Sequence, residues 1–153
     1  MQKIVPLFEE FIKDNKMQEE KDKTLVILRG LPGAGKSTFA KLLSRGNDDI
    51  VCCADDYFTD EQGNYNWNPK ELDKAHKQCQ DKCKNLMENG EPLIIISNTN
   101  VSLKGMQYYF DLAKEYGYRV TSTVIENRHG NKSIHNVPDT AIEKMRKSFD
   151  ISL

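Results

Sequence analysis

Hydrophobic and polar positions alternate along the chain in blocks whose period changes from one segment to the next. Short apolar runs rich in β-branched residues, such as TLVILR and PLIIIS, have the length and composition of buried strands. Longer segments between them carry apolar residues every three or four positions, the period of a helix that packs on one face. The predicted strands are residues 24–29, 50–54, 92–97 and 118–125. The predicted helices that follow them are residues 36–45, 68–89, 102–116 and 138–149.

Capping and turn residues mark the ends of these helices. Asn68, Pro69 and Glu71 combine a capping side chain, a proline in the first turn and an acid at the third helical position. Gly90 and Gly117 are typical of helix ends. The segment DDYFTDEQGNYNW, with its Gly and Asn turn signals, is predicted to be a loop.

Alternating strands and helices predict an α/β fold with a parallel β-sheet, helices on both faces, and ligands at the carboxyl ends of the strands. In the helix at 36–45, we expect Phe39, Leu42 and Leu43 to face the sheet. Helically spaced apolar residues in 3–16 predict an additional N-terminal amphipathic helix that packs onto the domain. The chain thus divides into an N-terminal helix and linker, residues 1–23, and one domain, residues 24–153.

Composition narrows the class of protein. With 153 residues, 29% charged, 38% hydrophobic and a net charge of −1, the chain suits one soluble domain and not a general polyanion binder. The apolar stretch IVPLF is too short and too charged in its flanks for a signal peptide or a membrane span, so we expect no membrane partner. Four cysteines do not suggest a disulfide framework and favour a reduced intracellular location, cytoplasmic or nuclear.

A phosphate-binding loop follows the first strand. The pattern Gly30-x-x-x-x-Gly35-Lys36-Ser37 lies between a predicted strand and a predicted helix, which is the context that a P-loop requires. Backbone amides and the helix N-terminus would face the phosphates, Lys36 would reach the β- and γ-phosphates, and Ser37 would bind Mg²⁺. The predicted phosphate-binding residues are Gly30, Leu31, Pro32, Gly33, Ala34, Gly35, Lys36, Ser37 and Thr38.

Two acids follow the second strand and suggest a catalytic base. Asp55 and Asp56 come where a strand of this fold ends beside the P-loop. A carboxylate there can orient an acceptor hydroxyl and take its proton. The alternative is that both acids are solvated loop residues or a helix cap.

The third strand ends in Ser97-Asn98 where many P-loop ATPases and GTPases carry an aspartate for Mg²⁺, which disfavours motors and switches. Asn100, with Ser102, either caps the following helix or lines an acceptor groove. The aromatic residues of the predicted loop stack on a base or pack in the core; they are Tyr57, Phe58, Tyr65 and Trp67.

A cationic segment, residues 126–138, precedes the last helix. It contains Arg128, His129, Lys132 and His135. A mobile flap of this kind would neutralise transition-state charge over the phosphates and exclude water. Arg128 is the best single candidate because its planar guanidinium suits phosphate oxygens. The alternative is an ordinary basic loop.

From residue 24 to residue 149, the chain resembles the P-loop polynucleotide 5′-hydroxyl kinases of the phage and end-healing type, a group related to the N-terminal kinase-like half of the myelin cyclic-nucleotide phosphodiesterase. The resemblance rests on GLPGAGKST, ADDYF, an apolar strand ending in TN, a GY-strand and a basic lid before VP, in that order. It implies a P-loop kinase fold for 24–153. It also implies transfer of the γ-phosphate of ATP or GTP, with Mg²⁺, to the 5′-hydroxyl end of single-stranded RNA or DNA.

The resemblance assigns roles to individual residues. Asp55 becomes the general base, Lys36 and Ser37 the phosphate and metal contacts, and Arg128 the lid arginine. Phe58 stands where these kinases have an arginine that grips the acceptor's phosphate, so the acceptor end would be held by stacking or by Lys104. The residues expected to bind the acceptor are Asp56, Asn98, Thr99, Asn100 and Lys104.

Two other functions fit the same sequence. One is a small-metabolite kinase of the same architecture, and the other is a module that binds nucleotide without turnover. No His-x-Thr or His-x-Ser pair and no Asp-x-Asp-Gly motif occurs, so the chain carries only the kinase step of an end-healing enzyme or is a piece of a longer one. The sequence does not choose between ATP and GTP, between RNA and DNA, or among oligomeric states.

Overall fold

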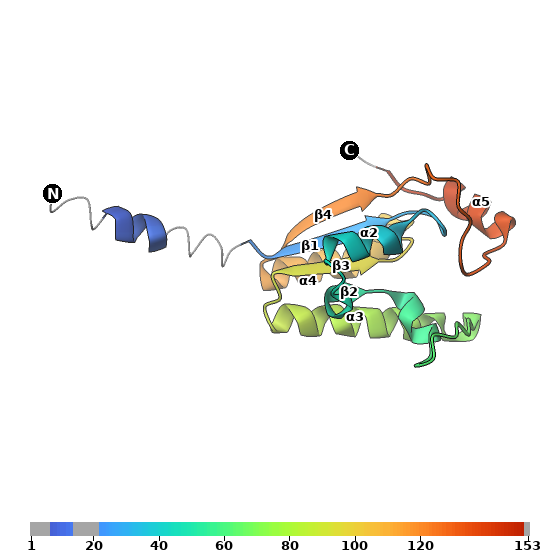
Figure 1. Ribbon diagram of the computed structural model, residues 1–153, viewed down its shortest axis with the longest axis horizontal. Coiled ribbons are helices and arrows are strands. Elements are labelled where there is room, and N and C mark those ends of the chain that lie inside the picture. Colours follow the sequence, from blue (N-terminus) through green and yellow to red (C-terminus); the bar gives the residue numbers. More distant parts are fainter. Residues whose placement is uncertain (1–6, 14–21, 152–153) are drawn as a thin grey trace.

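The computed structural model describes residues 7–13 and 22–151 (Figure 1). Four strands form one sheet in the order β2-β3-β1-β4, and every neighbouring pair is parallel. The strands are β1 (Thr24–Arg29), β2 (Val51–Cys52), β3 (Leu93–Ser97) and β4 (Arg119–Val124). The predicted parallel α/β sheet is confirmed, with β2 shorter than expected.

The strand that carries the P-loop lies inside the sheet. Thr24 of β1 is in register with Leu93 of β3 on one side and with Arg119 of β4 on the other. Because parallel strands end at the same edge of a sheet, the loops after all four strands meet at one end of the molecule.

Four helices cover the sheet or follow it. They are α2 (Lys36–Leu43), α3 (Leu72–Glu88), α4 (Leu103–Tyr116) and α5 (Asp139–Lys147). Three short 3-10 helices accompany them, at Asp48–Ile50, Ala54–Phe58 and Pro69–Glu71. The start of the segment predicted as a loop, residues 55–58, is therefore helical, as is Ala54, which was predicted to end the second strand. Asn68 and Gly117 mark helix ends as predicted: the Asn68 side chain accepts from the Lys70 amide, and Gly117 ends α4 in the left-handed conformation.

Helices lie on both faces of the sheet (Figure 1). Leu25 and Ile27 of β1 belong to the larger core, which contains buried residues of α3 and α4. Leu28, the residue after Ile27, belongs to a smaller core with Ala40 of α2. Successive side chains of a strand point to opposite faces, so α2 covers one face while α3 and α4 cover the other.

One expected inward residue of α2 points to solvent. Phe39 and Leu43 pack against the smaller core as predicted, but Leu42 is 71% exposed, so that prediction is wrong. Ala40 and Leu43 define the buried stripe of the helix. Leu42 is two positions from Ala40 and therefore lies about 200° around the helix from it.

The predicted N-terminal helix is present in part. Residues 7–13 are helical, and the remainder of the 3–16 segment lies outside the described residues. Leu7, Phe8, Phe11 and Ile12 are between 41% and 64% exposed, and the helix lies clear of the sheet (Figure 1). The prediction that it packs onto the domain is wrong, because helical periodicity specifies an apolar face but not the surface that covers it. Among the described residues, no helix has the length and apolar character needed to cross a membrane.

Candidate active site

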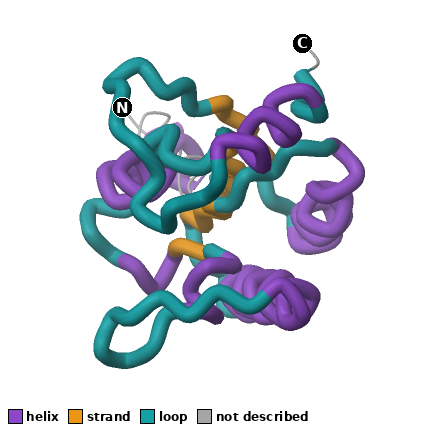
Figure 2. Tube along the Cα trace, turned by 90° about the vertical axis from the view of Figure 1, so that its right-hand side faces the viewer, coloured by secondary structure: helices purple, strands orange, loops and turns teal. Residues whose placement is uncertain are grey.

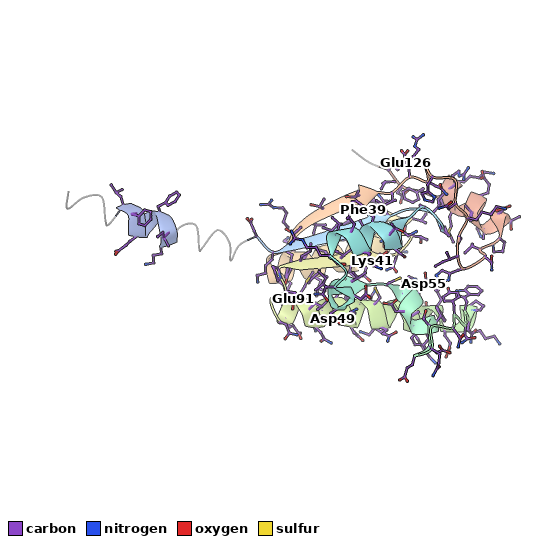
Figure 3. The ribbon with its side chains drawn as sticks, in the orientation of Figure 1. Phe39, Lys41, Asp49, Asp55, Glu91 and Glu126 are labelled. Atoms are coloured by element: carbon purple, nitrogen blue, oxygen red, sulfur yellow. The ribbon has the colours of Figure 1, made fainter. Side chains whose placement is uncertain are left out.

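Loops from all four strands gather at the carboxyl end of the sheet, the end that faces the viewer in Figure 2. The P-loop leaves β1, residues 54–58 follow β2, residues 98–102 follow β3, and the segment 126–138 comes soon after β4. Figure 3 shows Asp55 and Glu126 at this same end of the molecule. The fold therefore brings together the segments that the sequence singled out.

The P-loop backbone has the shape that phosphate binding requires. Gly33 and Gly35 are left-handed, with φ of 81° and 102°. Gly30 has no room for a side chain, because a Cβ there would lie 2.8 Å from the carbonyl oxygen of Ile125. Helix α2 starts at Lys36 with no side-chain cap on its N-terminus. Its first amides are therefore available to an anion.

Lys36 is folded back across the P-loop. Its Nζ donates to the carbonyl oxygens of Gly30 and Leu31, both at 2.9 Å. Burial lowers the pKa of Lys36, while the nearby Cys53 and Asp55 groups act in the opposite direction. Among these influences that of Asp55 is the smallest, and a catalytic part for Asp55 stays a prediction.

The side chain of Asp55 is partly exposed to solvent, and each of its two carboxylate oxygens lies near one neighbouring side chain. Its side chain is 48% exposed. The Tyr65 hydroxyl donates to Asp55 Oδ1 over 3.0 Å, and His135 Nε2 lies 3.7 Å from Oδ2. The carboxylate is not locked in the interior. Asp56, the second acid, is exposed.

The polar residues after β3 bind the protein's own backbone. Asn98 Oδ1 accepts from the Ala54 amide at 2.8 Å, directly before Asp55. Asn100 Nδ2 donates to the carbonyl of Leu28 at 2.7 Å, and the Thr99 carbonyl accepts from the amide of Gly30. These contacts join the ends of β1, β2 and β3.

Ser102 and not Asn100 caps α4, because the Ser102 hydroxyl accepts from the Gly105 amide at 3.1 Å. Asn100 itself has a left-handed backbone, with φ of 47°. Lys104, in the first turn of α4, is exposed. A role of these residues toward an acceptor remains a prediction.

The cationic segment 126–138 lies against the P-loop. Asn127 Nδ2 donates to the carbonyl of Gly33 at 3.3 Å. His129 Nδ1 accepts from the Asn131 amide, so Nε2 carries the proton and donates to the carbonyl of Ala34 at 3.2 Å. The segment therefore contacts the P-loop, and a flap over bound phosphates stays a prediction.

Arg128, the arginine predicted for this flap, pairs with an acid of its own segment. Its side chain is 84% exposed and pairs with Glu126. Lys132 and Arg146 instead line a hollow of about 500 Å³, which Leu31 and Pro32 of the P-loop also border. The sequence did not single out Arg146, because nothing in the pattern of α5 separates it from the other cations of that helix.

Two residues that contact Asp55 were also not assigned to it from sequence. Tyr65 was predicted to stack on a base or pack, and His135 was counted only among the cations of the flap. The only hint in the sequence is that each residue lies in a segment expected to follow a strand of the sheet. Their contact with Asp55 is established by the tertiary structure.

The site suits Mg²⁺ bound together with phosphates. Mg²⁺ usually takes one or two protein ligands and completes its shell with phosphate oxygens and water. Ser37 is exposed at the first turn of α2, beside the free amides of the P-loop, and fits the part of such a ligand. Among the residues that the structure describes, no three His, Cys, Asp or Glu side chains are grouped to hold a metal by themselves.

Sequence comparison gives the family. The AAA_33 family model, described as an AAA domain, matches residues 25–151. The chain belongs to this family. That range agrees with the extent of the resemblance found in the sequence, residues 24–149, and covers the whole sheet and the P-loop.

Relatives and solved structures support a kinase-like domain. Human NEDD4-binding protein 2 is 39% identical over 97 residues, 63% of this chain and 5% of that protein. Mouse 2′,3′-cyclic-nucleotide 3′-phosphodiesterase is 29% identical over 99 residues, 64% of this chain and 23% of that protein. The chain therefore spans less than a quarter of the length of either relative.

A chain in the structure of the Pnkp1/Rnl/Hen1 RNA repair complex superposes with a TM-score of 0.61 and 26% identity, over 82% of this chain and 43% of that one. Together with the parallel sheet and the P-loop, this match confirms the predicted P-loop kinase fold. The AAA family protein described here is a P-loop kinase-like, nucleotide-binding domain.

Proposed function

We propose that this domain transfers the γ-phosphate of a nucleoside triphosphate, ATP or GTP, to the 5′-hydroxyl end of single-stranded RNA or DNA. The observation that carries the proposal is the half-exposed Asp55 carboxylate after β2, at the same end of the sheet as the P-loop. A kinase needs a donor site and a base beside it that is open to an acceptor. This arrangement supplies both.

The donor is held by residues 30–38. On nucleotide binding, Lys36 exchanges the carbonyls of Gly30 and Leu31 for β- and γ-phosphate oxygens, and the amides at the start of α2 face the same group. Ser37 would be the protein ligand for Mg²⁺, and the ion, when bound, would neutralise charge on the β- and γ-phosphates.

The acceptor hydroxyl approaches from the Asp55 side. The 5′-oxygen forms its bond to the γ-phosphorus as the bond from that phosphorus to the β–γ bridging oxygen breaks, and nucleoside diphosphate leaves. Asp55 takes the proton of the hydroxyl. Asp56 and Lys104, both exposed, are the acceptor-binding candidates whose side chains are open to a ligand. Trp67, 56% exposed in the loop after Asp55, offers a surface on which a base can stack.

The cationic segment supplies charge to the transferring group. The exposed Arg128–Glu126 pair stabilises the protein by only about 0–1 kcal/mol, so a phosphate can compete for the guanidinium. Lys132 and Arg146, on the hollow beside the P-loop, are further candidates for the same role.

The comparisons support an RNA or DNA end as the acceptor. The likeness at 26% identity is to a chain of an RNA repair complex, and the mouse relative is named for a cyclic-nucleotide substrate. Both names concern nucleic-acid or nucleotide chemistry. On this basis we assign the acceptor to a polynucleotide and not to a sugar or another small metabolite.

The test is transfer of labelled γ-phosphate from ATP and GTP, with Mg²⁺, to single-stranded RNA and DNA oligonucleotides. We expect labelling of oligonucleotides with a free 5′-hydroxyl and none of the same oligonucleotides bearing a 5′-phosphate. Labelling of nucleosides or sugars alone would favour the metabolite kinase. Nucleotide binding without transfer to any of these acceptors would favour the non-catalytic module.

A further inference from the structure

Three residues from separate segments meet beside the P-loop. Asp55 lies in the 3-10 helix after β2, Tyr65 in the loop that follows, and His135 in the segment 126–138. The Tyr65 and His135 rings are stacked, with centroids 3.9 Å apart and planes at 26°. Both rings face the same carboxylate, because Tyr65 bonds to Oδ1 and His135 lies near Oδ2 of Asp55.

The Tyr65 hydroxyl is a fixed donor to Asp55. Burial and the neighbouring Asp55 carboxylate raise the pKa of Tyr65, so the phenol keeps its proton throughout the neutral range. The 3.0 Å bond to Oδ1 restricts rotation of the carboxylate about its last torsion. Oδ2 lies 3.7 Å from His135 Nε2, too far for a hydrogen bond, and is then the oxygen left for an incoming hydroxyl.

His135 connects this carboxylate to the donor site. Its side chain is 27% exposed, and its ring covers the Tyr65 ring. The segment that carries it also contacts the P-loop, through Asn127 at the Gly33 carbonyl and His129 at the Ala34 carbonyl. The segment 126–138 therefore contacts both the P-loop and, through His135, the side chains of Asp55 and Tyr65.

We propose that Tyr65 and His135 are positioning residues that hold the Asp55 carboxylate with Oδ2 toward the acceptor, and that His135 does so through the stacked Tyr65 ring. This inference rests on the proposed function of Asp55 as the base. Neither residue reacts with the acceptor or the nucleotide. Loss of either leaves the base present but badly oriented, a change that affects turnover more than binding.

Two variants test the Tyr65 hydroxyl and the His135 ring separately. Tyr65→Phe removes the hydroxyl and keeps the stack, and His135→Ala removes the stack. We expect each to lower kcat for phosphate transfer by about 10- to 100-fold, with nucleotide Kd and acceptor KM changed by less than about threefold. His135→Phe, which restores a stacked ring, should recover most of the activity lost in His135→Ala.

Matched controls exist elsewhere on the surface. Tyr116→Phe removes another tyrosine–carboxylate bond, the one from Tyr116 to Glu88 at 3.2 Å. His76→Ala removes an exposed histidine of α3. Both should leave kcat unchanged. Unchanged kcat in Tyr65→Phe and His135→Ala, in a protein that does transfer phosphate, would overturn the proposal.

A readout that needs no activity keeps the inference distinct from the proposed function. The carboxyl ¹³C signal of Asp55, assigned with Asp55→Asn in aspartate-labelled protein, should move in Tyr65→Phe and in His135→Ala but not in Tyr116→Phe. If the protein phosphorylates no 5′-hydroxyl end, the proposed function fails, and a moved signal still supports the positioning of Asp55. A signal that stays in place in both variants overturns the positioning role whatever the activity.

Discussion

Single side chains at the carboxyl end of the sheet are held in place by specific neighbours. Lys36 donates to two P-loop carbonyls, Asn98 holds the amide just before Asp55, and Tyr65 holds Asp55 itself. The contacts of Asn98 and Tyr65 orient Asp55 before any ligand arrives. Preorganised polar groups of this kind contribute more to catalysis than flexible ones, since they do not have to be ordered during the reaction.

Removal of the base should separate binding from turnover. In Asp55→Asn, we expect kcat for phosphate transfer to fall by a factor on the order of 10² or more, while nucleotide affinity changes little. The amide keeps the shape of the side chain but takes up no proton. Transfer kinetics and nucleotide titrations measure the two effects. Asp49→Asn, an exposed acid before β2, is the control, and equal kcat in the two variants would contradict the role of Asp55.

The Cys53 thiol should be unreactive in the folded protein. Burial raises its pKa from 9.0 to about 12, so at pH 8 only about 10⁻⁴ of it is thiolate, the form that reacts. Native alkylation of Cys53, followed by mass spectrometry, should be at least about 100-fold slower than alkylation in guanidinium. Equal rates in the two states would contradict the burial of this thiol.

The same shift has a consequence for stability. Above pH 9 the unfolded thiol ionises while the folded one stays neutral, so the unfolded state binds fewer protons. The free energy of unfolding should therefore fall as pH rises from 9 toward 12. Urea titrations at several pH values measure the loss, and Cys53→Ser should show a smaller one.

At the scale of elements, the site depends on how the P-loop packs against the segment 126–138. A Cβ on Gly33 would lie 2.6 Å from the backbone nitrogen of Ser133. Because the Cβ would meet backbone atoms of Lys132 and Ser133, no side-chain rotation could relieve the clash. The P-loop and the flap are therefore in direct contact, in addition to the hydrogen bonds from Asn127 and His129.

Two glycine variants distinguish this packing from backbone strain. Gly33 and Gly46 have similar left-handed φ values, 81° and 78°, but nothing lies within 4 Å of a Cβ at Gly46. Both alanine variants should lose about 1 kcal/mol from strain. Only Gly33→Ala should also displace the flap and weaken nucleotide binding. Thermal unfolding and nucleotide titration check both effects, and equal behaviour of the two variants would argue against the packing.

At the scale of the whole molecule, Arg29 joins segments that lie far apart in the chain. It is the last residue of β1 and is only 4% exposed. Its guanidinium donates to the carbonyls of Asn100, Val101 and Asp150, and lies 4.8 Å from the centre of the Phe149 ring. It therefore fastens the segment after α5 to the strand ends that carry the site.

Loss of this guanidinium should destabilise the domain. Arg29→Met removes a donor from three carbonyls, of which that of Val101 still accepts from the Asp150 amide, and we expect the free energy of unfolding to fall by about 3 kcal/mol. Arg119→Met is the control, because Arg119 is exposed and its ion pair with Asp22 contributes about 1 kcal/mol or less. Urea denaturation measures both. Losses of similar size would mean that Arg29 does not fasten the fold.

The accuracy of prediction from sequence depended on how local each feature is. The four strands, the helix start at Asn68, the helix end at Gly117 and the P-loop are set by neighbouring residues, and the structure has all of them. The inward position of Leu42 and the packing of the helix at 7–13 were wrong. Both depended on what lies opposite a helix face.

For the site, too, the sequence predicted the local features and did not predict the contacts between segments. Sequence placed Lys36 after the first strand and Asp55 after the second, and the parallel sheet brings both to its carboxyl end. It did not foresee that Arg128 pairs with Glu126 or that Asn98 and Asn100 bind backbone groups. These outcomes depend on distances between segments that only the folded sheet establishes.

By itself, the sequence determined the alternation of strands and helices and the conformation of the P-loop, because side-chain period and glycine placement act over a few residues. The tertiary structure decided which side chains hold Asp55, and that Arg29 joins residues 71 to 121 positions away. Such contacts form only when parallel strands bring their carboxyl ends to one edge, and no local pattern records the partner that each residue meets there.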